Sequence, residues 1–183
     1  MGKIYDHITD RLSDFIQRQK MFFVATAPLT ADGHVNVSPK GYDSFKIIDP
    51  NTVAYLDYGG SGIETHAHVL ENERITIMFC AFEGKANILR LYGRGEVCAF
   101  YDEGFDEKLA WFPEFDRARA IITVHVTRIT DSCGFAVPFY EFKGERDQLH
   151  RAHQNKTVEE WQAYRLSRNA ESIDGLPGLI RPE

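Results

Sequence analysis

In the middle of the chain, apolar and polar residues alternate with the two-residue period of β-strands. Three such segments are Val35–Ser38, Phe45–Ile48 and Val53–Tyr58. Turn-forming residues separate them at Pro39–Gly41 and Asp49–Asn51, because proline presets φ and the side chains of Asp and Asn bond back to the backbone. The pattern therefore predicts three short strands joined by tight turns.

A glycine-rich turn, Gly59–Gly62, follows the third strand and leads into a segment with a helical period. The helix predicted there ends at Asn72, before another strand at Ile75–Phe79, and its apolar face comprises Ile63, Ala67 and Leu70. Backbone N–H groups and hydroxyls such as those of Ser61 and Thr65 can hold a phosphate at a helix start. An ordinary strand-to-helix turn is the alternative, since the stretch has neither the P-loop lysine nor the spaced glycines of a dinucleotide fingerprint.

The same periodicities predict the other elements, which are an amphipathic helix at Tyr5–Gln19, strands at Met21–Ala27, Ile75–Phe82, Ala86–Phe100 and Ala120–Ile129, a helix at Glu103–Phe112, a polar helix or helix pair at Glu145–Arg168 and an extended tail at Ile173–Ile180. Strands follow one another closely, with short turns and few intervening helices. This order indicates an antiparallel barrel with flanking helices rather than a parallel α/β sheet.

The long strand at Ala86–Phe100 places Arg90 on one face and the apolar Leu89 and Leu91 on the other. An arginine amid apolar neighbours needs a carboxylate or a phosphate as its partner. Gly93 and Gly95 predict a bulge or sharp bend of the kind that barrels use to close.

Composition narrows the function classes. The 183 residues are most simply one domain, 1–183, with a helical C-terminal extension from about residue 140. The net charge of −6 and the lack of a basic run argue against a nucleic-acid partner. No apolar run is long enough to span a membrane, and the start has no apolar signal-peptide core. Three scattered cysteines favour reduced thiols in a cytoplasmic protein.

The seven histidines do not form a clear metal site. His66 and His68 are two apart on a predicted helix, so they point to different sides. His150 and His153 are three apart and could share an ion, but without a third ligand on that face a solvated helix is favoured. Neither a Ser-His-Asp arrangement nor a paired-carboxylate signature is evident, so no catalytic side chain is assigned.

Several motifs, in this order and spacing, together resemble the pyridoxamine 5′-phosphate oxidase-like family of FMN-binding split barrels. They are VNVSPKG, AYLDYGGSGIETHAHVLEN, RITIMF, ILRLYGRGEV and, in the tail, SCGFAVP and SIDGLPGL. The resemblance covers about residues 10 to 131, and the tail looks like that of one subgroup. It implies a mainly β, antiparallel split barrel that forms a homodimer, binds FMN and acts on a small-molecule substrate.

By position, the resemblance implies flavin contacts from Val37, Ser38, Lys40, Asp57, Tyr58, Ser61, Gly62, Thr65 and Arg90. In this family the glycine-rich turn cradles the FMN phosphate. The family often has a basic residue near the position of Thr65, where this chain has Ile63, Glu64 and Thr65. Lys40 or Arg90 would then have to supply the positive charge.

The resemblance leaves the activity open. True pyridoxamine 5′-phosphate oxidases have, near their C-terminus, a Trp-Gln followed after four residues by Arg-Leu-His-Asp-Arg. Here Trp161 and Gln162 are followed too early by Arg165, and Ser167 replaces the histidine. A two-residue deletion turns Arg165 by more than half a helical turn, so Trp161 is expected at a helix–barrel contact. The main alternatives are a non-catalytic flavin-binding protein, a true oxidase, and a relative that binds haem or a deazaflavin.

Overall fold

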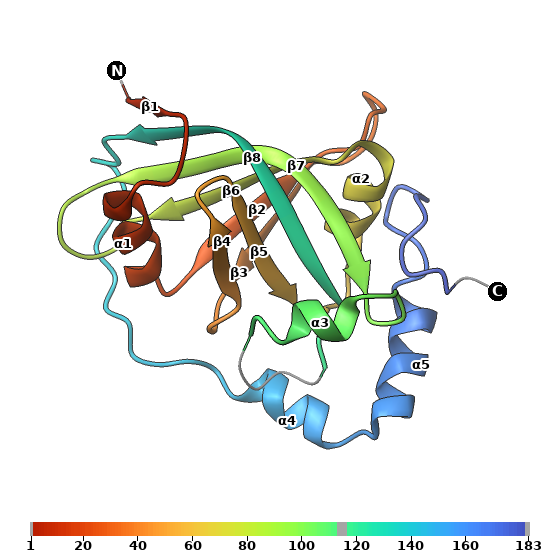
Figure 1. Ribbon diagram of the computed structural model, residues 1–183. Coiled ribbons are helices and arrows are strands. Elements are labelled where there is room, and N and C mark those ends of the chain that lie inside the picture. The colour runs from red at the N-terminus through yellow and green to blue at the C-terminus, as the bar shows by residue number, and fades with distance from the viewer. Residues whose placement is uncertain (1, 113–116, 182–183) are drawn as a thin grey trace.

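The computed structural model describes residues 2–112 and 117–181, and its strands form one antiparallel sheet (Figure 1). The strands are β1 (Ile4–Tyr5), β2 (Phe22–Thr26), β3 (Asn36–Lys40), β4 (Phe45–Asp49), β5 (Thr52–Asp57), β6 (Arg74–Cys80), β7 (Ile88–Ala99) and β8 (Ala120–Ser132). The helices are α1 (Asp10–Arg18), α2 (Glu64–Asn72), α3 (Phe105–Leu109), α4 (Gln148–Gln154) and α5 (Val158–Arg168).

The eight strands follow the order β3-β2-β6-β7-β8-β5-β4, with β1 added to β8. Within the described residues the edge strands β3 and β4 do not pair with each other, so the sheet is not closed. This confirms the predicted split β-barrel. Pro39 lies inside β3, opposite Phe23, whereas the sequence placed a turn there. An edge strand tolerates proline because one of its sides has no ladder partner.

The predicted apolar face, Ile8, Leu12, Phe15 and Ile16, packs into the main core, with Ile8 lying just before the cap of α1. The helix starts later than the predicted Tyr5, because Thr9 caps it by accepting a hydrogen bond from the Leu12 N–H. Ile4 and Tyr5 instead pair with Thr130 and Ile129 of β8. The N-terminal segment thus extends the sheet before it covers one end of the barrel.

The two longest strands, β7 and β8, pair along their whole length with one register shift between Tyr92 and Gly93. A Cβ atom at Gly93 would lie 2.4 Å from the His125 carbonyl oxygen, so the close approach requires glycine. The predicted bulge is therefore confirmed. Leu89 and Leu91 are fully buried, as the alternation along β7 predicted.

Helix α2 starts and ends as the sequence predicted, but its buried face differs. Leu70 is 56% exposed, so its assignment to the apolar face is wrong. Ile63 and Ala67 are buried as predicted, and His66 and Val69 are buried in addition. The helical period alone does not determine which face of α2 packs on the barrel.

Beyond β8 the chain forms an extended segment, residues 133–147, then α4, α5 and a turn-rich tail (Figure 1). Of the two alternatives for Glu145–Arg168, the helix pair is confirmed. The predicted helix Glu103–Phe112 is shorter, only Phe105–Leu109, and Pro113 lies outside the described residues. Trp161 of α5 is 3% exposed and meets the Phe100 ring edge-on at 5.8 Å, which confirms the expected helix–barrel contact.

Candidate functional site

The turn Gly59–Gly62 connects β5 to α2, and Gly59 adopts the left-handed conformation with φ of 81°. Among the described residues no side chain caps the N-terminus of α2, where Ile63 holds the N-cap position. The first N–H groups of a helix have no partner within the helix itself. This helix start therefore offers donors and a positive dipole end to an anion.

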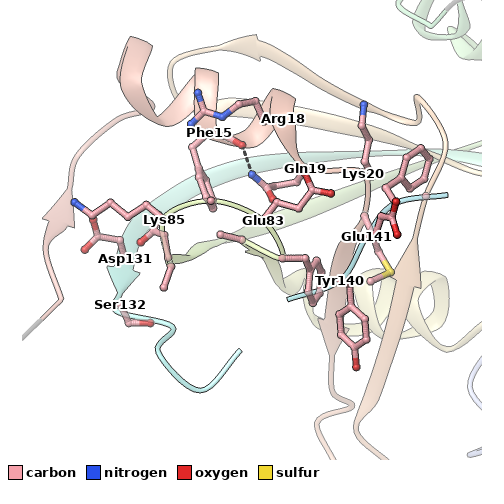
Figure 2. Close-up of a pocket in the computed structure, with 18 of the residues that line it drawn as sticks. Phe15, Arg18, Gln19, Lys20, Glu83, Lys85, Asp131, Ser132, Tyr140 and Glu141 are labelled. Carbon is pink, nitrogen blue, oxygen red and sulfur yellow. Dashed lines mark hydrogen bonds between the residues drawn. The ribbon is translucent and has the colours of Figure 1, made fainter. Parts of the chain in front are cut away.

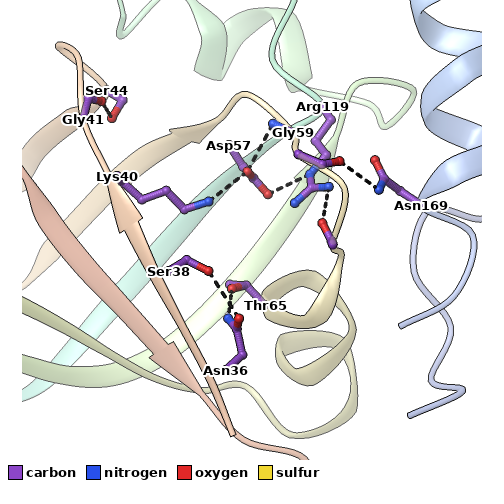
Figure 3. A network of polar contacts seen from close by, with 12 residues as sticks. Asn36, Ser38, Lys40, Gly41, Ser44, Asp57, Gly59, Thr65, Arg119 and Asn169 are labelled. Carbon is purple, nitrogen blue, oxygen red and sulfur yellow. Dashed lines mark hydrogen bonds and ion pairs between the residues drawn. The ribbon is translucent and has the colours of Figure 1, made fainter. Parts of the chain in front are cut away.

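A hollow of about 270 Å³ lies at this helix start (Figure 3). Its lining residues come from β3, from the turn, from α2 and from the segment before β8; they are Ser38, Lys40, Gly60, Ser61, Gly62, Glu64, Thr65 and Arg119. Five of them, Ser38, Lys40, Ser61, Gly62 and Thr65, are residues for which the resemblance implied flavin contacts. The fold thus brings together segments that are 20 or more residues apart.

A buried ion cluster forms one wall of the hollow. The Asp57 carboxylate accepts from Arg119 Nε at 2.9 Å and from Lys40 Nζ at 3.3 Å, and its side chain is 2% exposed. Burial alone would raise the pKa of Asp57, but Arg119 and Lys40 together lower it well below its usual range. Asp57 therefore stays ionised and holds two cationic side chains against the hollow.

Hydroxyl groups complete the opposite wall. Thr65 Oγ1 accepts a hydrogen bond from Asn36 Nδ2 at 2.8 Å, which leaves the hydroxyl hydrogen of Thr65 available to a ligand. The Ser38 hydroxyl donates to Asn36 Oδ1 at 3.3 Å (Figure 3). Asn36 thus orients the Thr65 side chain that the sequence had assigned to the phosphate.

The fold places the remaining predicted residues outside the lining of the hollow. Val37 is 60% exposed on β3, and Tyr58 packs edge-on against the ring of Tyr42 at 5.6 Å. Arg90 donates to Ser132 Oγ at 3.2 Å, near the end of β7 remote from the α2 start. Within this chain Lys40 and Arg119, rather than Arg90, supply positive charge to the hollow. Flavin contacts by Val37, Tyr58 and Arg90 stay predictions.

The sequence reasoning missed Arg119, Arg165, Asn169 and the role of Asn36. Arg119 Nη1 donates to the Gly62 carbonyl at 2.7 Å, and Arg165 Nη1 donates to the Gly60 carbonyl at 2.8 Å. One signal was available for the α5 residues: Trp161, Arg165 and Asn169 recur at intervals of four, which places them on one helical face. All three are buried.

One acidic side chain opposes anion binding at this site. Glu64, the first residue of α2, lies so close to Gly62 that a Cβ there would be 2.2 Å from Glu64 Oε2. The backbone N–H of Ile173 donates to Glu64 Oε1 at 3.4 Å. That contact directs part of the Glu64 charge toward the C-terminal tail.

The histidines of α2 are buried and do not form a metal site. His68 Nδ1 lies 3.0 Å from Thr26 Oγ1, and burial lowers the pKa of His66 to about 4. Across residues 2–112 and 117–181, no group of three or more His, Cys, Asp or Glu side chains is arranged to hold a metal ion. None of the described helices has the length and apolarity that a membrane span requires.

A second, much larger cavity of about 1650 Å³ lies between α1 and the 133–147 segment (Figure 2). Arg18, Lys85, Asp131, Tyr140 and Glu141 are among its lining residues. The cavity and the hollow share no lining residue. They are adjacent in sequence at one point, where Lys40 lines the hollow and Gly41 lines the cavity. None of the nine predicted site residues lines the large cavity.

The fold is that of a split-barrel protein, with a hollow at the uncapped start of α2 among the described residues. Residues 8–133 match the family described as pyridoxamine 5′-phosphate oxidase. A curated relative from Aspergillus flavus, the pyridoxamine 5′-phosphate oxidase family protein ustO, is 36% identical over 197 residues, covering 98% of this chain and 78% of the relative. The chain belongs to the pyridoxamine 5′-phosphate oxidase family.

Solved structures agree on the fold. HupZ of Group A Streptococcus superposes with a TM-score of 0.53 at 25% identity, covering 73% of this chain and 99% of HupZ. A crystal structure from Lactobacillus delbrueckii has a TM-score of 0.51 at 16% identity, covering 68% of this chain and 94% of the other. At that identity the second likeness shows the fold alone.

Proposed function

We propose that this protein binds FMN, with the phosphate in the hollow at the start of α2, and is an oxidoreductase acting on a small molecule. The observation that carries the proposal is the buried Lys40–Asp57–Arg119 cluster beside a helix start without a side-chain cap among the described residues. The family expectation of a cradled FMN phosphate and the geometry of this hollow agree.

The charges around the turn fit a phosphate monoester. Three cationic side chains, Lys40, Arg119 and Arg165, surround the turn, while Asp57 is its fully buried carboxylate. Glu64 contributes one further negative charge at the rim. An excess of positive charge in a buried cluster is unfavourable until an anion enters. A phosphate monoester supplies up to two negative charges and several acceptor oxygens.

The chain's own residues would bind and orient the cofactor. Lys40 and Arg119 would offset phosphate charge, and the Thr65 hydroxyl and the turn N–H groups would donate to phosphate oxygens. A bound flavin accepts and passes on a hydride or an electron pair. No side chain is assigned as acid or base.

The substrate we propose is not pyridoxamine 5′-phosphate. In true oxidases the C-terminal arginine and histidine hold that substrate over the flavin. Here Arg165 is 6% exposed and bonds to the Gly59–Gly62 turn, and Ser167 replaces the histidine. Turnover of pyridoxamine 5′-phosphate at about one per second or faster, measured on the flavin-loaded protein, would overturn this part of the proposal.

We also propose a homodimer that completes the flavin site. Val35, just before edge strand β3, is 71% exposed, and Val37, on that strand, is 60% exposed. This edge lies next to the hollow. Symmetric pairing would cover such an edge and its apolar side chains. An interface on the order of 2,000 Å² is expected. Sedimentation at micromolar concentration checks it, and a monomer there would contradict it.

The test of FMN binding is a spectrum of the purified protein followed by titration of the apoprotein with FMN and riboflavin. We expect flavin absorption bands, and binding of FMN at least about tenfold tighter than that of riboflavin, since only FMN has the phosphate. Haem bands, or equal affinity for the two flavins, would contradict the proposal. Bound FMN that no reductant in a substrate screen reduces would favour the non-catalytic alternative.

A further inference from the structure

We propose that α5 is a positioning element for the cofactor phosphate, in which Arg165 and Asn169 hold the Gly59–Gly62 turn from behind. The inference rests on the proposed function, because it concerns how the same phosphate site keeps its shape. It assigns to the C-terminal extension a role that the barrel does not provide. Arg165 and Asn169 act through the turn and do not touch the cofactor themselves.

Arg165 bonds to the first two carbonyl groups of the turn. Its Nη1 donates to the Gly60 carbonyl at 2.8 Å and its Nη2 donates to the Gly59 carbonyl at 3.4 Å. The guanidinium lies so close to Gly59 that a Cβ there would be 2.8 Å from Arg165 Cζ. Gly59 thus combines a positive φ with a surface on which the arginine packs.

The other two carbonyl groups are also held. Asn169 Nδ2 donates to the Gly60 carbonyl at 3.3 Å and to the Ser61 carbonyl at 3.4 Å. Arg119 Nη1 donates to the Gly62 carbonyl at 2.7 Å. Every carbonyl oxygen of the turn is therefore fixed by a side chain that is at least nine-tenths buried.

Fixing these carbonyls also fixes the N–H groups of the turn. A trans peptide is planar, so its N–H points opposite to its C=O. The three N–H groups from Gly60 to Gly62 belong to the peptides whose carbonyls Arg165 and Asn169 hold. Figure 3 shows Asn169 on one side of the turn and Lys40 and Thr65 on the other. These three N–H groups are thus held pointing away from Arg165 and Asn169.

The arginines support this assignment through their charge. Burial lowers the pKa of Arg165, and the nearby Arg119 lowers it further. Neighbouring guanidinium groups repel each other, and Asp57 supplies one negative charge that Arg119 shares with Lys40. Trp161 stacks under Arg165, with Arg165 Cζ 5.4 Å from the ring centroid, so α5 supplies the support for its own arginine.

The tail locks α5 to the residue before α2. The Leu179 N–H donates to the Asn169 carbonyl at 2.7 Å, and Leu179 is buried with Ile63 in one small cluster. A Cβ at Gly178 would lie 2.8 Å from Ile63 Cγ1. The extension therefore makes two contacts with the site. Helix α5 contacts the turn, and the tail contacts Ile63 at the start of α2.

The experiment compares FMN and riboflavin affinity in wild type, Arg165→Ala and a matched control, Arg168→Ala. Arg168 is an exposed arginine in the same last turn, so both variants lose one positive charge. We expect Arg165→Ala to weaken FMN binding about tenfold or more with riboflavin affinity unchanged, because only FMN uses the phosphate turn. Arg168→Ala should leave both affinities unchanged.

A second variant, Arg165→Lys, covers the case in which Arg165→Ala does not fold. It keeps the charge but loses the fork that spans two carbonyls, so a smaller loss of FMN affinity, again without a loss for riboflavin, is expected. Equal losses for both flavins would indicate a merely structural role and overturn the inference.

The wild-type titration separates the two claims. If wild type does not prefer FMN, the proposed phosphate site itself fails. If wild type prefers FMN and Arg165→Ala or a folded Arg165→Lys keeps the full preference, the proposed function stands and the inference about α5 is overturned.

Discussion

The molecule has two concave regions that differ in kind. The hollow of about 270 Å³ is built on buried ion pairs and hydrogen bonds, whereas the cavity of about 1650 Å³ is lined largely by exposed side chains such as Phe135 and Tyr140. Phe135 is 83% exposed, while the Arg119 side chain in the hollow is 4% exposed. Size alone would favour the large cavity as the ligand site.

The proposed ligand site therefore rests on buried charge rather than on cavity size. A buried ionic group is costly unless it is paired, and at the hollow Asp57 is paired with both Arg119 and Lys40. Exposed charges such as Glu141 cost little wherever they lie. Substitutions of the same kind should therefore have unequal effects in the two regions.

The largest contrast should come from removing one negative charge in each region. Asp57→Asn leaves the buried Arg119 without its carboxylate, and we expect the free energy of unfolding to fall by about 3 kcal/mol or more. Glu141→Gln, in the large cavity, should change it by less than about 0.5 kcal/mol. Urea unfolding near pH 7 measures both, and equal effects would remove the distinction between the regions.

The second contrast concerns acid. Burial keeps His66 neutral down to a pKa of about 4, whereas an unfolded chain protonates histidine near 6.5. Acid therefore favours unfolding between these values, by up to about 3 kcal/mol at and below pH 4. His66→Gln should flatten this part of the stability–pH curve, while the same change at the exposed His7 should not. An unchanged slope in His66→Gln, from urea unfolding between pH 4.5 and 7.5, would count against it.

The third contrast adds a negative charge to each region. Thr65→Glu places a carboxylate against the proposed phosphate, so FMN affinity should fall by about 2 kcal/mol, or roughly 30-fold. Phe135→Glu adds the same charge at the large cavity and should leave FMN affinity unchanged. Flavin titration measures both, and undiminished FMN affinity in a folded Thr65→Glu protein would refute the phosphate assignment.

The smallest effect concerns the thiols. Cys133 is exposed and lines the large cavity, while burial raises the pKa of Cys80 and Cys98. One thiol per native chain should react rapidly with a disulfide reagent, and saturating FMN should not slow that reaction. Protection of Cys133 by FMN would place the flavin in the large cavity instead of the hollow.

The fold was largely predictable because strand and helix periods are local properties. Alternation placed the strands, and Gly93 marked the bulge through the close approach that excludes a side chain. The errors occurred where tertiary contacts override local pattern. Leu70 is exposed and His66 buried because the barrel, rather than hydropathy, decides which face of α2 is covered.

The site was predictable only where its residues are near one another in sequence. Ser61, Gly62 and Thr65 share one turn, and Lys40 ends the strand that lies beside it. Arg119 lies 62 residues after its partner Asp57, and Arg165 lies 105 residues after its partner Gly60, yet both reach this site. Periodicity does not state which strand end meets which helix, so these partners required the structure.

The capping box of α5 has a kinetic consequence. Thr157 and Glu160 fix the first turn of the helix by reciprocal hydrogen bonds, yet α5 buries only Trp161 and Arg165, and α4 before it buries no residue. Segments with so little buried surface open far more often than the barrel core. If α5 holds the turn, each opening of α5 is also an opportunity for the cofactor to leave. The dissociation rate would then follow the fraying of one short helix, and the residence time could be tuned at Thr157, which does not line the hollow.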